Sequence, residues 1–597
     1  MKKIYLLIAT TALCLVNLSS CKDLDKYPKD SVSSALYFST ADQLEQYSNQ
    51  FYTIFPSAAD LYGEISDEIT ASTLPDEMMG SRVVPVDASG TQWDWTMLRH
   101  INYLLEHVDQ CLNEDAKRQY TGLAYFFRAY FYFNKVRYYG DVPLARHTLG
   151  SNDEKLYSAR TSRTTVMDSV LYDLNQAIEM LPKQGSTYRV NAYTAMALKS
   201  RVCLFEGTFR KYHGMDNYKD ILMEGANAAL QLMNSGVYSL FTQKGPHYGA
   251  YRNLFCQGKY EGNCEVILAR YYGAEVKLTH NANGYTVSST TGKPGFTKRF
   301  VNQFLMADGS RFTDQENYDK IQMGKELTNR DPRMEQIVLR PTHYYRVGEN
   351  EVDKYSVKTS ATGYQLIKYV MEKGKDTYNQ SDCDVPLFRY AEVLLNYAEC
   401  LAEAGELTQS NIDQSIKLLR ERAGMPNLIM ADANGNPCPY MESLYPNVDK
   451  GGNKGVILEI RRERDIELVQ EGFRYWDLMR WKEGQALTKP LTGMSFGGVS
   501  KSKTDKSGCV NTKNDNPSAF DVCVWSTPNP QDKPFSFGVT YLELNKDVWL
   551  TNGMDGGDIL CHGTDVRTFN EDRDYLYPIP TQEIILSNGA LKQNPGW

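Results

Sequence analysis

The sequence lacks the residue patterns that most catalytic and metal sites require. Its eight histidines occur without HxxxH or HExxH spacing, and none of its 12 cysteines form the CxxC pairs of zinc or thioredoxin-like sites. A phosphate-binding glycine loop is also absent. We therefore expect no catalytic residue, no metal site and no cofactor.

An excess of basic charge and long apolar runs are also missing. The 597 residues include 65 basic and 73 acidic side chains, a formal net charge of −8. This balance argues against nucleic acid as a partner. After the first twenty residues, no stretch has the run of about 20 apolar residues that crosses a bilayer. We expect a chain that is not threaded through a membrane.

The N-terminus has the features of an export signal. Two lysines precede an apolar run from Ile4 to Val16, which has about the length of a signal h-region. Small residues then lead to Cys21, in a pattern that resembles a bacterial lipobox. An ordinary secretory signal that ends near a cysteine is the alternative. We predict that residues 1–20 are a lipoprotein signal peptide and that acyl chains on Cys21 anchor the mature chain.

Helices are predicted wherever a hydrophobic period is readable. Thr40 to Gln43 has the capping-box pattern that starts a helix. The period is strongest from Arg118 to Tyr139, and Gly140 follows as a stop signal. Two further helical stripes each end at a glycine: they are Ala195–Phe205 before Gly207 and Tyr390–Ala404 before Gly405.

The order of these stripes predicts a mainly α fold. Small residues mixed with aromatics indicate antiparallel helix pairs of tetratricopeptide type, although no strict 34-residue repeat is visible. We expect this scaffold over about 40–235 and 384–485. The intervening stretches, about 239–380 and 486–575, are rich in glycine and polar residues and predict a large irregular region with short β elements. Binding residues are usually carried by loops on such a frame.

Several charged residues fall on helical stripes that should be buried. Burying an unpaired charge costs several kcal/mol, so these residues must pair with one another or with other helices. A catalytic carboxylate pair, as in glycosidases, is the alternative. Arginine neighbours argue against it, because they keep carboxylates ionised whereas a general acid needs a raised pKa. The predicted structural ion-pair residues are Arg389, Glu392, Glu399, Arg464, Glu467, Glu471 and Arg474.

Cysteine usage leaves two disulfides open. In an exported protein, Cys256 with Cys264 or Cys509 with Cys523 are candidate pairs. Most of the cysteines are interpreted equally well as small buried hydrophobic side chains.

Six segments occur in a distinctive order along the chain. They are Gly122–Leu144, Asn329–Arg333, Asp384–Glu399, Glu459–Trp481, Tyr577–Pro580 and Gln593–Trp597. Together with the lipobox, they resemble the SusD/RagB family of surface nutrient-binding lipoproteins. The resemblance spans residues 21–597 and implies a single domain of that kind.

The resemblance implies a function as well as a fold. Family members bind a glycan in an irregular region and lie over a SusC-like TonB-dependent barrel transporter. The charged stretch after Cys21 resembles a cell-surface address in Bacteroidota, although a solvated tether fits it equally. We therefore expect a lipid-anchored outer-membrane protein that captures an oligosaccharide for import and is not an enzyme. The alternatives are a peptide-binding or other nutrient-binding subunit, a surface glycosidase and a structural adhesin.

Candidate ligand contacts follow from the chemistry of sugar recognition. Sugar C–H faces stack on aromatic rings while hydroxyls bind polar groups, and residues 76–82 and 92–95 supply both. Their position resembles a loop that contributes to glycan binding in the family. We expect Trp93 to contact the ligand and Trp95 to pack against the following helix. The other nominated contacts are Asp76, Met79 and Arg82, and a second group of Tyr271, Tyr272, Tyr285 and Tyr344 with His343 and Tyr345.

Overall fold

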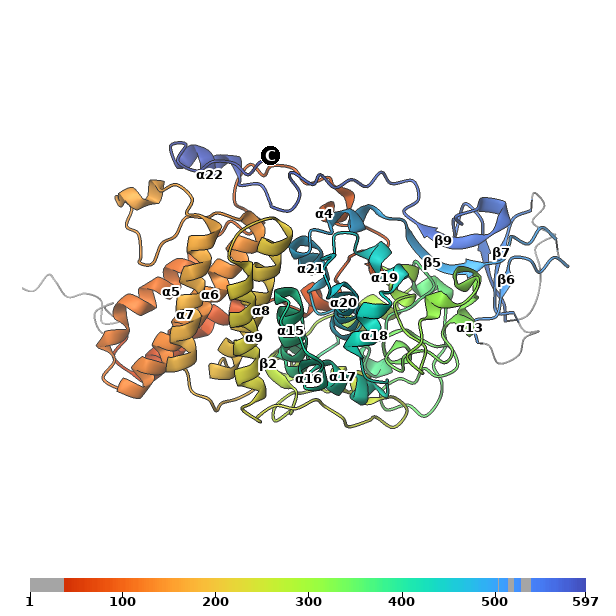
Figure 1. The fold of residues 1–597 in the computed structure, drawn as a ribbon, viewed down its shortest axis with the longest axis horizontal. Coiled ribbons are helices and arrows are strands. Elements are labelled where there is room, and N and C mark those ends of the chain that lie inside the picture. The colour runs from red at the N-terminus through yellow and green to blue at the C-terminus, as the bar shows by residue number, and fades with distance from the viewer. Residues whose placement is uncertain (1–36, 503, 514–519, 528–537) are drawn as a thin grey trace, which may run out of the picture.

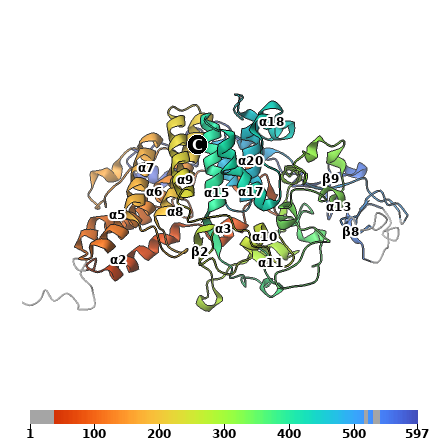
Figure 2. The same ribbon diagram turned by 60° about the horizontal axis from the view of Figure 1, so that its bottom comes forward.

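The computed structural model describes residues 37–502, 504–513, 520–527 and 538–597. Long helices form an array at one end of an elongated molecule, and short helices, strands and loops fill the other (Figures 1 and 2). The predicted mainly α fold is confirmed. The predicted signal peptide and Cys21 lie outside the described residues. Within the described ranges, no helix is long and apolar enough to span a bilayer.

The helical array is built from helices that pack against their neighbours in the chain. Helix α6 packs against α7 and α8 against α9, while α15 contacts both α8 and α9 and carries α20 on its other side. These pairs agree with the predicted helix-pair scaffold. The array comprises α2 (Ala41–Ser48), α5 (Thr96–His107), α6 (Glu114–Tyr139), α7 (Arg163–Met180), α8 (Ala192–Tyr212), α9 (Tyr218–Met233), α15 (Tyr390–Ala404) and α20 (Lys454–Leu468).

Shorter helices lie outside the array or cap its ends. They are α3 (Ala58–Tyr62), α4 (Asp76–Met79), α10 (Ala250–Phe255), α11 (Ala282–Val287), α12 (Lys298–Val301), α13 (Met323–Glu326), α14 (Met334–Ile337), α16 (Gln409–Asp413), α17 (Ile416–Ala423), α18 (Met430–Gly435), α19 (Pro439–Leu444), α21 (Arg474–Arg480) and α22 (Thr581–Leu586). Helices α10 to α14 belong to the irregular region, and the second large core of the molecule includes Phe300, Tyr364 and Leu491.

The predicted helix ends are partly right. Thr40 caps α2 in a capping box with Gln43, and Gly405 ends α15 in a left-handed conformation with φ of 79°. The predicted stop at Gly207 is wrong, because α8 continues to Tyr212. Gly207 instead allows α9 to approach, since a Cβ there would lie 2.6 Å from Leu222 Cγ.

Short strands connect distant parts of the irregular region. The predicted β run at Val266–Leu268 lies in β2, which pairs antiparallel with β4 at the start of α15. Two other antiparallel pairs are β1 with β3 and β5 with β9, and a fourth sheet has the order β6-β7-β8 with β7 and β8 parallel. The strands are β1 (Ile69–Thr70), β2 (Val266–Arg270), β3 (Gly295–Phe296), β4 (Val385–Arg389), β5 (Leu491–Phe496), β6 (Cys509–Val510), β7 (Val522–Trp525), β8 (Thr540–Glu543) and β9 (Gly557–Cys561).

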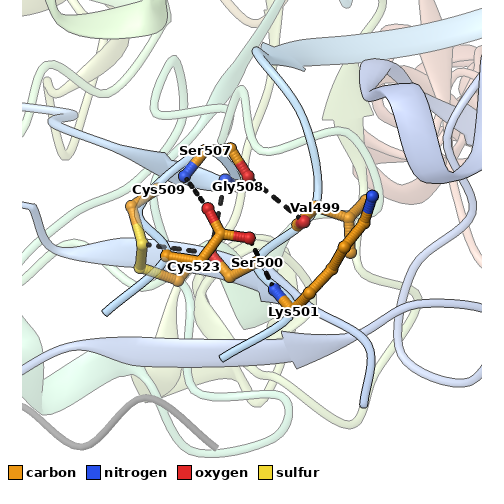
Figure 3. The surroundings of a disulfide bond; sticks show 8 residues. Val499, Ser500, Lys501, Ser507, Gly508, Cys509 and Cys523 are labelled. Carbon is orange, nitrogen blue, oxygen red and sulfur yellow. Dashed lines mark hydrogen bonds between the residues drawn. A yellow bond between two sulfur atoms is a disulfide. The ribbon is translucent and has the colours of Figure 1, made fainter. Parts of the chain in front are cut away.

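One of the two candidate disulfides is formed. Cys509 of β6 and Cys523 of β7 lie opposite each other in the antiparallel register and are bonded. Figure 3 shows the bond beside Ser500, whose Oγ lies 3.7 Å from Cys509 Sγ. Cys256 and Cys264 are free thiols, so the alternative pair is not formed.

Buried ion pairs join the helical array to the irregular region. The seven charged side chains singled out from the sequence are at most 5% exposed, and each pairs with opposite charge. Burial alone would raise the pKa of Glu467, but Arg422, Arg389 and Arg333 outweigh it and lower the pKa to about 2. The pairs are Arg389 with Glu467 and Glu471 (both 2.7 Å), Arg464 with Asp477 (2.7 Å) and Glu399 (3.8 Å), Arg474 with Asp67 (2.7 Å) and Asp465 (2.8 Å), and Glu392 with Arg201 (2.6 Å).

Candidate functional site

Two adjoining hollows lie beside the C-terminal part of α6. The first, which we call the loop hollow, has a volume of about 520 Å³ and is lined by residues 75–77, 82, 83, 85, 90–92, 138–139 and 577–578. The second, the seam cavity, has a volume of about 360 Å³ and lies between α6, the start of α15 and α21. Gln92 and Tyr138 line both hollows, so the two are neighbours.

The loop hollow contains part of the first nominated group. Asp76 begins the short helix α4 with its side chain exposed, and its Oδ1 accepts a hydrogen bond of 2.7 Å from Ser81 Oγ. Gln92 is also exposed at the edge of this hollow. Met79, by contrast, is not among the lining residues. A carboxylate and an amide are thus free to bind hydroxyl groups.

Arg82 supports one wall of the loop hollow. It pairs with Asp574 at 3.2 Å, and its guanidinium lies 4.5 Å from the ring centroid of Tyr577. Tyr577 in turn donates a 2.8 Å hydrogen bond to Glu77, and its backbone N–H binds the carbonyl of Tyr138. These contacts hold the C-terminal segment, which runs back along the helical array in Figure 1, against α4 and α6.

The expectation for Trp93 needs correction. Its side chain is only 2% exposed and packs against Trp95 and Tyr139, with ring centroids 5.4 and 4.8 Å away. A sugar ring therefore cannot stack on Trp93 in this conformation. Trp95 is half-buried against α6, as expected for a packing residue.

A buried lysine of α6 fixes the orientation of the backbone at residues 92–94. Lys135 of α6 is 5% exposed and donates hydrogen bonds to the backbone carbonyls of Gln92 and Asp94. Burial lowers its pKa to about 7, against a smaller opposing effect of Asp94. The two bonds hold the backbone on either side of Trp93 against α6, so that Trp93 is buried while Gln92 stays exposed.

The second nominated group does not gather at the loop hollow. Tyr272 and Tyr344 are 3% and 2% exposed and belong to the core. Tyr285 is half-buried against Tyr62, and Tyr271 lines a separate hollow of about 260 Å³. His343 is exposed, and Tyr345 stacks on His247.

Three aromatic residues at the hollows were missed by the sequence reasoning. Tyr138 and Trp476 lie in the predicted helical scaffold and Tyr577 in a segment near the C-terminus. The ring centroid of Tyr138 is 4.7 Å from each of the other two. No local pattern connects residues this far apart in the chain. In the part of the chain that the structure describes, no group of three or more His, Cys, Asp or Glu side chains is placed to hold a metal ion.

Comparisons with known proteins agree on one family. The SusD family model matches residues 264–597, more than half of the chain, and a model described as "Starch-binding associating with outer membrane" matches residues 39–204. Two SusD-like proteins of Formosa agariphila are 25% and 23% identical, over 82% and 98% of this chain and 94% and 99% of their own lengths.

Solved structures share the fold. A SusD-like protein from Bacteroides fragilis is similar with a TM-score of 0.65 and 22% identity, covering 96% of this chain and 100% of that one. A SusD-like carbohydrate-binding protein from the same species also has a TM-score of 0.65, with 20% identity over 93% of this chain and 99% of its own. The whole described architecture is therefore of a known type.

Proposed function

This chain belongs to the SusD/RagB family, and on that premise we propose that it is a surface lipoprotein that binds a glycan without cleaving it. In this role it captures an oligosaccharide for import through a SusC-like TonB-dependent transporter. The proposed anchor is the acylated Cys21, which holds the protein on the outer membrane.

The composition of the loop hollow carries this proposal. The exposed Asp76 and Gln92 offer hydrogen bonds to hydroxyl groups, and the half-buried ring of Tyr577 offers an apolar face nearby. Small-ligand sites combine these elements in clefts of roughly 300–1,000 Å³, and the hollow has about 520 Å³. The description of one family model as starch-binding, and of one similar structure as carbohydrate-binding, supports a glycan as the ligand.

The proposal of binding without catalysis rests on the carboxylates. Glu467 and Glu471 of the scaffold are paired with arginines that lower their pKa and keep them ionised. In the loop hollow, Glu77 already accepts a hydrogen bond from the hydroxyl of Tyr577. A glycosidase needs one carboxylic acid poised to donate a proton.

We predict that Asp76→Ala and Gln92→Ala each weaken glycan binding about tenfold, because each removes a hydrogen bond worth on the order of 1–2 kcal/mol. Calorimetry with the soluble chain, residues 22–597, against a panel of glycans and peptides measures this. Asp220→Ala is the matched control, since Asp220 is another exposed acid in the first turn of a helix. Unchanged affinity in both variants would show that the loop hollow is not the binding site. Binding to peptides alone would show that the ligand is a peptide and not a glycan.

The transporter partnership is tested separately. We expect the full-length lipoprotein, expressed in its native outer membrane, to co-purify with a TonB-dependent barrel. Isolation without any barrel partner under conditions that preserve membrane complexes would count against this part of the proposal.

A further inference from the structure

The seam cavity contains an arginine that lacks an acidic partner. Arg137, near the end of α6, lines this cavity, and no carboxylate of the described residues lies within ion-pair distance of its guanidinium. Its Nη2 donates a 2.6 Å hydrogen bond to Asn134 Oδ1, while its Nε is buried without a hydrogen-bond partner in the described structure. A cation in this state is costly unless an anion joins it.

The acidic groups around the cavity are already engaged. Glu392 accepts two bonds from Arg201, of 2.6 and 2.7 Å, and Glu471 pairs with both Arg389 and Lys368. Asp60, at the edge of the cavity, caps α3 by accepting bonds from the backbone and hydroxyl of Ser57. None of these carboxylates compensates the charge of Arg137.

Aromatic rings hold the guanidinium of Arg137 in place. It lies 4.9 Å from the ring centroid of Phe133 and 4.5 Å from that of Trp476. These contacts orient a flat donor group without neutralising it. Burial lowers the pKa of Arg137 by more than the nearby Tyr130 and Tyr138 raise it, and Arg201 lowers it further.

We propose that the seam cavity binds the anionic substituent of a sugar residue, a carboxylate or a sulfate, through Arg137. This inference rests on the proposed glycan-binding function. Because Gln92 and Tyr138 line both hollows, a sugar chain in the loop hollow has its neighbouring residue beside the seam cavity. The cavity's volume of about 360 Å³ suits a single sugar ring, and a planar guanidinium matches the geometry of such oxyanions. The substrate class is then an acidic glycan.

Matched oligosaccharides test this assignment. We would titrate the soluble chain with neutral galacto-oligosaccharides, oligogalacturonate and sulfated carrageenan oligosaccharides, alongside the wider glycan panel. We expect at least one acidic probe to bind tenfold or more tightly than its neutral counterpart, as a charge-assisted hydrogen bond provides. Tighter binding of oligogalacturonate would identify the anionic substituent as a carboxylate, and tighter binding of the carrageenan oligosaccharides would identify it as a sulfate.

Variants of Arg137 locate the effect. Arg137→Met should abolish the preference for the acidic probe and leave the affinity for the neutral probe unchanged, whereas Arg137→Lys should retain part of it. Because the methionine variant loses an unpaired charge, its melting temperature should not fall, and this controls for misfolding. Arg311→Met, which makes the same charge change in a separate hollow, should keep the preference.

The titrations distinguish failure of the anionic site from failure of the proposed glycan-binding function. Equal affinities for acidic and neutral probes, absence of binding to any acidic probe, or an unchanged preference in Arg137→Met would overturn the anionic site alone. If every glycan of the wider panel also failed to bind, the proposed function itself would fall.

Discussion

At the scale of single residues, the buried carboxylates differ in how well their charge is compensated. Glu467 touches several arginines and has a pKa lowered to about 2. Burial raises the pKa of Glu64 to about 7, and hydrogen bonds from the backbone of Gly472 and Arg474 offset this only in part. The sequence shows that such charges exist, but their compensation depends on residues from 45 to 410 positions away.

Glu64 predicts a pH dependence of stability. Its folded-state pKa lies above the ordinary 4.5, so its contribution is fully present below pH 4.5 and is lost as pH rises towards 7. Between pH 5 and pH 8, the wild type should therefore lose roughly 2 kcal/mol of unfolding free energy through the ionisation of Glu64. Glu64→Gln should not show this loss. Urea unfolding at both pH values measures this. Glu45→Gln on the surface is the control, and an identical pH dependence of Glu64→Gln and the wild type would refute the assignment.

A contact of a single residue also explains why Trp93 is buried, contrary to the prediction that it contacts the ligand. Two tryptophans separated by one residue give no sign of which one faces the core. The answer comes from Lys135, more than forty residues later, which binds the carbonyls on both sides of Trp93. Arg137 was missed for a related reason, because an arginine without an acidic partner cannot be recognised until all its neighbours are known.

At the scale of elements, local patterns predict helices well and strands poorly. The stripes at 118–139 and 390–404 are helices, because their period and their stop signals are local. The stop at Gly207 was wrong, since the glycine serves a contact with α9 rather than a helix end. Strands β6 to β8 have no readable period, and their pairing joins residues that are not adjacent in the chain.

The disulfide between β6 and β7 should stabilise this sheet locally. It closes a loop with a sequence separation of 14 residues, for which the constraint on the unfolded chain is worth about 3 kcal/mol. We predict that the double variant Cys509→Ala and Cys523→Ala exchanges the amide hydrogens of β6 to β8 markedly faster, while α15 keeps its protection. Cys264→Ala, which removes a free exposed thiol, is the control. Unchanged exchange in the sheet would contradict a stabilising role.

At the scale of the whole molecule, the loop hollow brings together segments that lie far apart in the chain. The loop hollow combines residues 75–92, Tyr138 of α6 and Tyr577 near the C-terminus. Of the residues nominated from the sequence, Asp76 and Arg82 line this hollow, as does Gln92 from the second nominated segment. Its aromatic members could not be predicted, because they converge only after the chain has folded.

In the proposed function, this protein holds a glycan and leaves it intact. The most direct test is a calorimetric titration of residues 22–597 with the oligosaccharide selected from the panel, followed by mass spectrometry of the recovered ligand. We predict saturable binding and a ligand of unchanged mass after prolonged incubation. Shortened products that accumulate with time, or saturable binding of peptides but of no glycan, would contradict the account.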